Sequence, residues 1–278
     1  MRDDLAWIAS LWHEEGKPSV WGWDKAVVAE LVKRGVERTL MPSDEQLHAI
    51  RQLSNRSLAV EMLAYLRSIK GTTGHSAVCH TYDEVAAFSS QYGNTIVKAP
   101  WSSSGRGVKE LSERNKAFIL NTISKQGSVI AEQKCQRVRD FALEYSVDEQ
   151  GKVVYQGLSL FSTSSGAYTG NLLLPEDEKL AILAAQLDIQ LLRQVSQRIR
   201  QFLSPRLKGV YSGPFGVDMM VCGEPARALN PCIEINLRRT MGHVALALTQ
   251  QGHRGTMTIL YNKERDKYEL NINQNITL

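Results

Sequence analysis

The sequence predicts an α+β fold in which a short helical region precedes a larger region of helices and antiparallel strands. Apolar residues recur at helical intervals as far as about residue 66. Beyond residue 75, capped helices alternate with short apolar runs, and two long extended segments follow. With 278 residues and 43% apolar content, the chain can bury a sizeable core in one large or two modest domains.

Three helices are expected in the N-terminal part. Asp24 can cap the first helix, which stops at Gly35. Ser43 and Gln46 have the spacing of a capping box and begin the second helix. The third helix precedes residues 71–79, whose glycines break the helical pattern. The residues expected to face the core are Val27, Val28, Leu31, Val32, Leu47, Ile50, Leu53, Leu58, Met62, Leu63 and Leu66.

The middle of the chain alternates helices with strands. Thr81 and Glu84 form another capping box, and Ser112 can cap a helix that ends near Gly127. Each helix is followed by a short apolar strand, and two longer strands joined at 149–151 are expected to pair antiparallel. The expected strands are 94–100, 128–133, 139–148 and 152–161.

The next segments contain a polar stretch and a long helix. Residues 162–177 are rich in Ser, Gly and Thr, which predicts a mobile functional loop that could act as a lid. Residues 178–203 have apolar side chains at helical intervals and predict one helix. This helix leads into a strand hairpin over 214–242.

The hairpin carries oxygen ligands among apolar residues. Asp218 lies in its first strand, and Glu234, Asn236 and Arg238 share one face of the second because strand side chains alternate. Two carboxylates and an amide oxygen suit Mg²⁺ or Mn²⁺, which proteins often hold together with substrate phosphates. The alternative is a solvated strand face that binds nothing.

A metal site requires Asp218 and Glu234 to lie on the same face of the hairpin. The numbers of paired positions must then sum to an even number. An odd sum would need a bulge, and Pro231 is its expected place because proline has no N–H to donate. Opposite faces without a bulge would exclude the site.

A second polar segment has the composition of a phosphate-binding loop. Its small residues let backbone N–H groups approach an anion, its hydroxyls donate, and its lysine supplies positive charge. The lysine precedes the glycines, so the segment is not the P-loop motif. The alternative is an ordinary Ser/Gly turn with a surface lysine. The candidate residues are Lys98, Ser102, Ser103, Ser104, Gly105, Arg106 and Gly107.

Over about residues 55–250 the order of elements resembles the ATP-grasp superfamily of ATP-dependent ligases. In that family a strand lysine and a small glycine-rich loop cover the phosphates, which matches Lys98 and the loop after it. The resemblance implies that Glu132 and the backbone of Gln133 and Lys134 form the hinge that holds adenine. It also implies that Asp140 binds the ribose.

The resemblance also covers the hairpin. The family places a metal-binding acid on one strand and Glu-x-Asn on the next, matching Asp218, Glu234 and Asn236. Members of the biotin carboxylase and carbamoyl-phosphate synthetase types continue with x-Arg, the place of Arg238. Further candidates are a second phosphate-binding residue, Arg56, where the family more often has lysine, and an acceptor-binding residue, Asn171.

The resemblance implies a domain layout. Residues 1–57 would be a reduced N-terminal domain, since no convincing first strand occurs there, and residues 58–278 would form the ATP-grasp domain. Two α+β subdomains would clasp ATP between them. The small nucleotide-binding subdomain is expected at about 80–133, and the metal-binding subdomain at about 134–278.

The implied activity is that of a ligase that forms carbon–nitrogen bonds. A substrate carboxylate would attack the γ-phosphate of ATP to give an acylphosphate and ADP, and an amine or other nucleophile would then displace phosphate. ATP and Mg²⁺ or Mn²⁺ are the implied cofactors, with Lys98 and Arg238 as catalytic residues. Two alternatives stay open, an ATP-dependent phosphotransferase on the same fold and a non-catalytic nucleotide-binding regulator.

Composition bounds the partners. The net charge of +4 is spread along the chain without a long basic block, which disfavours nucleic-acid binding. No apolar run is long enough to span a bilayer, and the four scattered cysteines fit reduced thiols, so a cytoplasmic protein is expected. The expected partners are small-molecule carboxylates and amines, with a homodimer left open because family members often pair.

Overall fold

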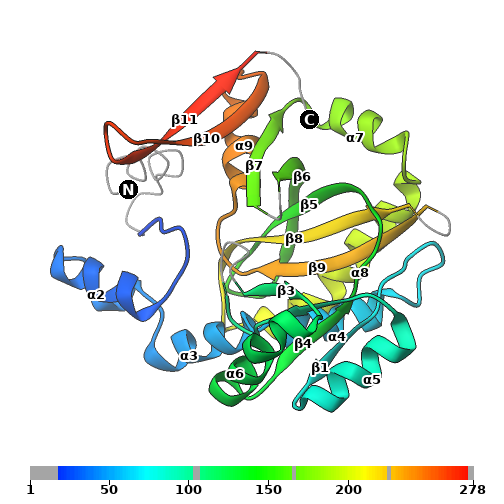
Figure 1. Ribbon diagram of the computed structural model, residues 1–278. Coiled ribbons are helices and arrows are strands. Elements are labelled where there is room, and N and C mark those ends of the chain that lie inside the picture. The colour runs from blue at the N-terminus through cyan, green and yellow to red at the C-terminus, as the bar shows by residue number, and fades with distance from the viewer. Residues whose placement is uncertain (1–17, 103–106, 165–166, 224–226, 275–278) are drawn as a thin grey trace.

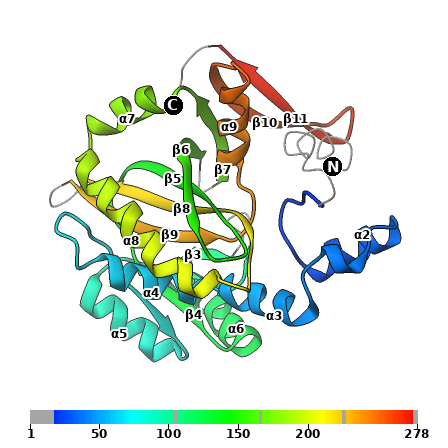
Figure 2. The same ribbon diagram turned by 180° about the vertical axis from the view of Figure 1, so that it is seen from behind.

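The computed structural model of the protein describes residues 18–102, 107–164, 167–223 and 227–274. Two antiparallel sheets, one four-stranded and one seven-stranded, organise these residues, and helices pack on both sheets (Figures 1 and 2). The prediction of an α+β fold is therefore confirmed. None of the described helices is both long and apolar enough to cross a membrane.

The N-terminal helices form largely as expected. Asp24 accepts the Val27 N–H at 2.8 Å at the start of α2, and Ser43 and Gln46 make the full capping box of α3. Val32 was expected in the core, but it is 48% exposed because only Val28 and, partly, Leu31 of α2 pack into a small cluster. The bounds are α2 Lys25–Lys33, η1 Arg38–Leu40, α3 Asp44–Leu53 and α4 Ser57–Leu66.

The four-stranded sheet has the order β1-β4-β2-β3 and is packed against α5 and α6. Thr81 caps α5 by accepting the Glu84 N–H, and Gly127 ends α6 in the left-handed conformation. Ser112 makes no side-chain capping bond, so that predicted cap is wrong. The bounds are β1 Ser76–Cys79, α5 Tyr82–Tyr92, β2 Thr95–Lys98, β3 Val108–Glu110, η2 Glu113–Asn115, α6 Lys116–Gln126 and β4 Val129–Gln133.

The seven-stranded sheet has the order β11-β10-β7-β6-β5-β8-β9. Its strands β5 and β6 are the two long segments expected to pair antiparallel, and they do so. Strands β10 and β11 and helix α9 were not predicted. The bounds are β5 Arg137–Val147, β6 Val153–Ser164, β7 Ala167–Leu173, β8 Gly213–Cys222, β9 Ala228–Asn236, α9 Met241–Gln250, β10 Gly255–Asn262 and β11 Lys267–Asn273.

The predicted lid at 162–177 is mostly a strand. Strand β6 continues to Ser164, and β7 lies between β6 and β10 in the sheet. The small residues of this segment reflect close packing: a Cβ at Gly170 would lie 2.4 Å from the Met257 carbonyl oxygen. A lid is therefore the wrong interpretation of the described part of the segment, which excludes residues 165–166.

The predicted helix at 178–203 is two helices. The chain turns near Leu187, and Asp188 begins a new helix by accepting the Gln190 N–H at 2.8 Å. Apolar residues of both helices and of the turn join the main core, as Leu183, Leu187 and Leu192 show. The helical spacing of apolar residues therefore continues through the turn, and the break between the helices cannot be seen in the sequence. The bounds are α7 Glu176–Ala184 and α8 Ile189–Leu207.

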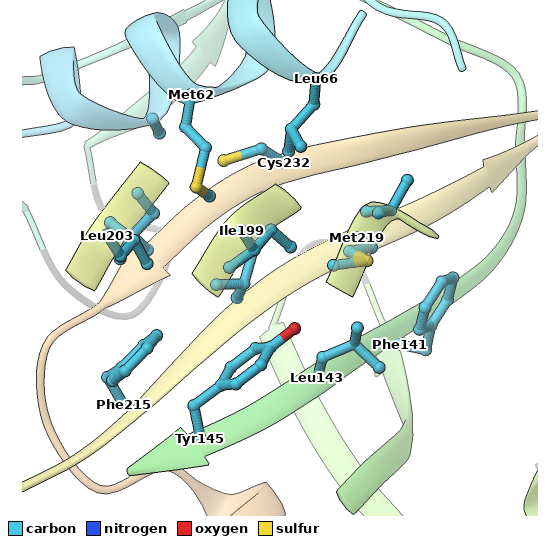
Figure 3. Packing of buried hydrophobic residues seen from close by; sticks show 14 of the residues in the cluster. Met62, Leu66, Phe141, Leu143, Tyr145, Ile199, Leu203, Phe215, Met219 and Cys232 are labelled. Atoms are coloured by element: carbon cyan, nitrogen blue, oxygen red, sulfur yellow. The ribbon is translucent and has the colours of Figure 1, made fainter. Parts of the chain in front are cut away.

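The main core lies between the large sheet and helices α4 and α8 (Figures 2 and 3). Alternate residues of β5 and β8 face these helices and are almost fully buried. The opposite face of β5, β8 and β9 is thereby left for polar side chains. Core residues seen in Figure 3 include Met62, Leu66, Phe141, Leu143, Tyr145, Ile199, Leu203, Phe215, Met219 and Cys232.

Candidate functional site

The candidate site lies on the face of the large sheet turned away from the main core. On β5, Asp140, Ala142 and Glu144 alternate with the core residues and line a pocket. Ala142 is paired with Asp218 of β8, and Asp218 with Glu234 of β9. Strand pairing thus brings residues that are far apart in the sequence into one row.

The hairpin prediction about faces is confirmed. Asp218 stands directly opposite Glu234, so their position numbers sum to an even number. The register shifts between this pair and the pair Met220 and Asn230, whose sum is also even. A bulge at Pro231 was expected only for an odd sum, but the irregular stretch includes Pro231 although the sum is even. Both acids therefore lie on the pocket face.

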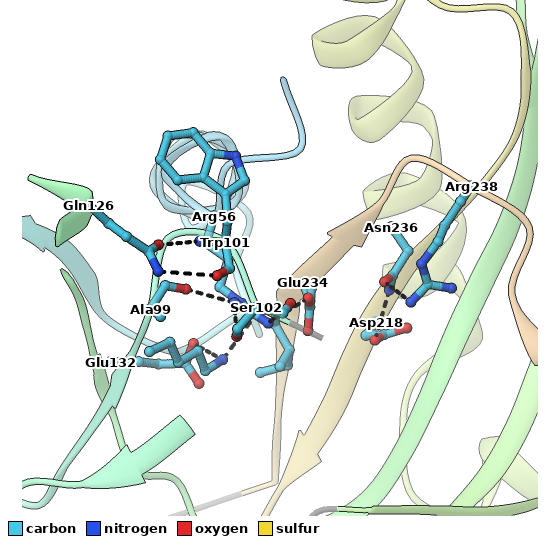
Figure 4. Close-up of polar contacts among 12 residues, drawn as sticks. Arg56, Ala99, Trp101, Ser102, Gln126, Glu132, Asp218, Glu234, Asn236 and Arg238 are labelled. Atoms are coloured by element: carbon cyan, nitrogen blue, oxygen red, sulfur yellow. Dashed lines mark hydrogen bonds and ion pairs between the residues drawn. The ribbon is translucent and has the colours of Figure 1, made fainter. Parts of the chain in front are cut away.

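Asp218, Asn236 and Arg238 form a connected group on this face (Figure 4). The Asn236 amide nitrogen donates to Asp218 Oδ2 at 3.1 Å, and its oxygen accepts from Arg238 Nη2 at 2.9 Å. Burial, followed by the nearby charge of Glu234, raises the pKa of Asp218 to about 7. A cation between the two acids would reverse that effect.

Arg56 connects the predicted phosphate loop to β9 (Figure 4). Its Nη2 donates to Glu234 Oε1 at 2.8 Å, and its Nη1 donates to Ser102 Oγ and to the Ala99 carbonyl, both at 2.7 Å. Arg56 immediately precedes α4 and is only 6% exposed. The residue is therefore part of the pocket and does not simply decorate a helix surface.

Lys98 spans the two sheets from the end of β2. Its Nζ donates to Glu132 Oε2 at 2.6 Å and to the Ile233 carbonyl of β9 at 3.3 Å. Both members of this ion pair are buried, so the alternative of a surface lysine beside an ordinary turn is wrong. Gly107 lies near Ser102 beside the pocket, whereas the predicted loop residues Ser103, Ser104, Gly105 and Arg106 lie outside the described residues.

The predicted hinge residues line the same pocket. The N–H of Gln133 donates to the His75 carbonyl at 2.9 Å, and that of Lys134 donates to the Asn94 carbonyl at 2.8 Å. These two N–H groups are thus already used inside the small sheet. Cys135, the next residue, also lines the pocket and was not singled out from the sequence.

The ribose and acceptor candidates differ in their surroundings. Asp140 lies 3.1 Å from Arg137 in an ion pair and accepts from Thr163 Oγ1 at 3.0 Å. Asn171 is 1% exposed, donates to Ser159 Oγ at 2.7 Å, and accepts from the Tyr168 hydroxyl at 2.6 Å. Both residues line the pocket.

The N-terminal segment contributes pocket residues that sequence reasoning missed. Trp21 and Trp23 line the pocket, and the Trp21 carbonyl accepts the Arg239 N–H at 2.7 Å. Gly22 lies so close to Arg238 that a Cβ at position 22 would be 2.9 Å from Arg238 Cβ. The two tryptophans were the available signal, because tryptophan combines a large apolar ring with a hydrogen-bonding N–H and is enriched at interfaces. The pocket has a volume of about 1590 Å³.

The donor set fits a divalent cation that also binds phosphate oxygens. Among the described residues, no group of three His, Cys, Asp or Glu side chains could hold a metal. Asp218 and Glu234 supply two facing carboxylates. Asn236 turns its amide nitrogen to Asp218 and its oxygen to Arg238, so its side chain would have to rotate to offer the oxygen to a cation. Mg²⁺ typically takes one or two carboxylates and completes its shell with substrate phosphates and water. The three side chains suit a Mg²⁺ ion that is also coordinated by substrate phosphates better than an ion coordinated by protein groups alone.

Glu144 lines the pocket and is only 1% exposed. Burial, together with the charge of Asp218, raises its pKa to about 8, while Thr240, Arg238 and Lys179 act in the opposite direction. An acid whose folded-state pKa is raised loses stability as pH rises through the window from its unfolded value, near 4.5, to about 8.

Glu144→Gln should therefore gain stability relative to the wild type as pH increases. The difference should be small near pH 4.5 and should grow by at most about 1.4 kcal/mol per pH unit up to about pH 8. Urea unfolding of both proteins at pH 5, 6.5 and 8 measures it. Free energies of unfolding that change in parallel would contradict the burial argument.

Comparison with known proteins identifies similar folds at low identity. No protein-family model and no curated protein sequence matches the chain. Biotin carboxylase from Campylobacter jejuni, in a complex with β,γ-ATP, superposes with a TM-score of 0.54 at 18% identity, covering 80% of this chain and 48% of that one. The biotin carboxylase domain dimer of 2-oxoglutarate carboxylase from Hydrogenobacter thermophilus, with MgADP, ADP and bicarbonate, gives 0.54 at 11% identity, covering 88% and 59%.

A third similar structure is N5-carboxyaminoimidazole synthetase from Staphylococcus aureus, complexed with ADP. Its TM-score is 0.52 at 14% identity, and the alignment covers 77% of this chain and 58% of that one. The chain thus spans about half to three fifths of the length of these three structures. At such identities the similarity establishes the fold.

Proposed function

Because the chain has the ATP-grasp fold, we propose that it is an ATP-dependent ligase. It activates a substrate carboxylate as an acylphosphate and joins it to an amine or other nucleophile, with release of ADP and phosphate. One observation carries the proposal: the cations Arg56 and Lys98 meet the acids Asp218 and Glu234 in a single pocket.

In this proposal the adenine lies at the hinge between the sheets. The pocket wall there contains apolar side chains from both sheets, Ile96 from the small one and Ile233 and Met220 from the large one. Gln133 and Lys134 use their N–H groups within the small sheet, and the Gln133 carbonyl accepts the Cys135 thiol at 3.7 Å. The proposed contacts to the base are therefore the Lys134 carbonyl and the backbone of Cys135. Asp140 then binds the ribose.

The phosphates lie between the two sheets. Lys98 and Arg56 both reach this space, and each is paired with a carboxylate, Glu132 and Glu234 respectively. The phosphate oxygens of a bound nucleotide would compete with these carboxylates for the two cations. Bound Mg²⁺ or Mn²⁺ would offset charge on the transferring phosphoryl group, held by Asp218, Glu234 and Asn236. Lys98 and Arg56 add fixed positive charge on the other side, where it stabilises the same transition state.

Arg238 is the proposed contact to the activated substrate. It shares the pocket face with Asn236, and its guanidinium is fixed by that amide and by the Arg239 carbonyl at 2.9 Å. A guanidinium fixed in this way can orient a carboxylate through two parallel hydrogen bonds, which a lysine could not reproduce. Trp21 and Gly22 then wall the substrate side.

Metal-dependent ADP release tests the proposal. The purified protein is incubated with MgATP and a panel of bicarbonate, α-amino acids, dicarboxylates and small peptides, with mass analysis of products. We expect one carboxylate to stimulate ADP release and a ligated product to appear with an amine. Glu234→Gln is the inactive comparison, and Glu61→Gln, which changes a carboxylate remote from the pocket, is the matched control.

Three outcomes would contradict a ligase. A phosphorylated alcohol would indicate a phosphotransferase, ATP binding without ADP release would indicate a regulator, and no ATP binding would remove the nucleotide site. Calorimetric titration of MgATP distinguishes the last two.

A further inference from the structure

Glu144 lies in the same row of the sheet as Asn236, one row along from the proposed metal-binding acids Asp218 and Glu234. It is paired with Gly216 of β8, which is in turn paired with Asn236 of β9. The next row contains Ala142, Asp218 and Glu234. Glu144 therefore lies on the pocket face beyond the row of the two acids, in the row of Asn236, which fixes Arg238.

The ionised form of Glu144 is buried with few hydrogen-bond donors around it. Its Oε2 is 3.1 Å from His243 Nδ1, but that nitrogen accepts the Thr240 N–H and so does not carry a proton to donate. Among the described residues, Oε2 has no hydrogen bond. Buried carboxylates are normally paired, and an unpaired one costs free energy.

Two glycines hold the space that this carboxylate occupies. A Cβ at Gly242 would lie 1.9 Å from Glu144 Oε1, and a Cβ at Gly216 would lie 2.6 Å from Oε2. Either side chain would displace the carboxylate. The chain thus accommodates a buried acid with a free acceptor oxygen on the wall of a ligand pocket.

Nearby cations do not satisfy this acid. Lys179 donates to the Leu158 carbonyl and pairs with Glu176 at 3.3 Å. Arg238 is directed to Asn236 and to the carbonyl of the next residue. The neutral acid can donate to His243 Nδ1, whereas the ionised carboxylate has only Thr240 as a side chain that favours its charge by hydrogen bonding. The ionised form is therefore suited to a hydrogen-bond donor or cation that enters through the pocket.

We propose that the pocket end lined by Glu144 binds the amino group of the nucleophilic substrate, with the Glu144 carboxylate as its acceptor. The inference rests on the proposed ligase function and specifies an amine as nucleophile. The amino group lies beside Arg238 and the acylphosphate, because Glu144 is one strand row from Asp218 and Glu234.

The step balances at Glu144. The bound ammonium gives one proton to the carboxylate, and the nitrogen lone pair forms the C–N bond while the bond from the acyl carbon to the phosphate oxygen breaks. The second amine proton leaves with phosphate as hydrogen phosphate, and Glu144 later returns its proton to solvent. Burial makes the Glu144 carboxylate a stronger base than an exposed glutamate. The charged or titratable groups around it are Asp218, Arg238, Lys179, His243 and Tyr145.

Glu144→Gln separates the two half-reactions. Hydroxylamine is uncharged at neutral pH and reacts with acylphosphates without a base, so it bypasses Glu144. With the carboxylate that stimulates wild-type ADP release, we expect Glu144→Gln to lose amide formation by about 100-fold and to keep hydroxamate formation within about threefold. Loss of both products, or retention of both, would overturn the proposal.

Gly242→Ala provides a second variant, because its Cβ displaces the carboxylate without removing it. It should show the same selective loss of amide formation, with MgATP binding and thermal unfolding as checks on the fold. Wild-type amide formation in this variant would overturn the proposal.

Binding of an amine to the proposed subsite can be measured without any turnover. Methylammonium chloride titrated into the MgADP-bound wild type should shift amide NMR signals around Glu144, with sodium chloride as the control, and Glu144→Gln should abolish the shift. Absence of the shift in the wild type contradicts the amine subsite, whereas absence of ADP release with every carboxylate contradicts the ligase function.

Discussion

Replacing Lys98 by methionine and Glu132 by glutamine together should lower metal-dependent ADP release by about 10²–10³-fold while the protein stays folded. Lys98 is the small-sheet cation that reaches toward β9, so its loss removes positive charge from the transferring phosphoryl group. The paired substitution is needed because the ion pair is buried. Lys98→Met alone leaves Glu132 unpaired, which should cost about 3–5 kcal/mol of stability.

The single variants complete the cycle. Glu132→Gln retains Lys98, so it should keep most ADP release and change mainly the affinity for the nucleotide. Free energies of unfolding from urea and rates of ADP release are measured on all four proteins. A double variant that folds and releases ADP at the wild-type rate would remove Lys98 from the mechanism.

Asp218→Asn should abolish metal-dependent ADP release and at the same time stabilise the empty protein above pH 7. Burial and Glu234 raise the pKa of Asp218 to about 7. Its folded-state pKa thus lies above the ordinary value of 3.8, and the wild type loses stability as pH rises between these values. The amide removes that loss, by at most about 1.4 kcal/mol per pH unit, and leaves one carboxylate fewer for the cation.

Glu234→Gln gives the opposite stability result and serves as the comparison. It should also abolish activity, but it removes the carboxylate that Arg56 contacts at 2.8 Å, so stability should fall. Unfolding midpoints at pH 5 and 8, with and without MgATP, measure both effects. A stabilised Asp218→Asn protein that still turns over would contradict the metal assignment.

Local patterns predicted much of the fold where one chain segment determines the structure. The capping box of Ser43 and Gln46 and the stop at Gly127 are satisfied within a few residues. Strand β7 was mistaken for a loop because its Ser, Gly and Thr content is polar, while its stability comes from pairing with β6 and with β10, some eighty residues later. Long-range pairing of this kind leaves little trace in local composition.

For the candidate site, too, local patterns predicted what one strand determines and missed what depends on long-range contacts. Alternation along one strand put Glu234, Asn236 and Arg238 on a common face, and the even register with Asp218 confirmed it. The contact of Arg56 with Glu234 joins residues 178 positions apart, so no local pattern contains it. Glu144 was missed because a glutamate between Leu143 and Tyr145 is typical of a solvated strand face. Only the sheet shows that this face is the pocket wall.

The spacing of side chains along β5 also sets the distances between the proposed binding sites. Asp140, Ala142 and Glu144 are successive side chains on one face, and a strand rises roughly 3.4 Å per residue. The proposed ribose, metal and amine sites therefore lie about 7 Å from one to the next along β5. Strand β5 is held by hydrogen bonds to β6 and to β8. The distance between the proposed ribose site and the proposed amine site is therefore set by the rise per residue of this strand. Side-chain changes can alter which amine binds, but not how far from the nucleotide it must react.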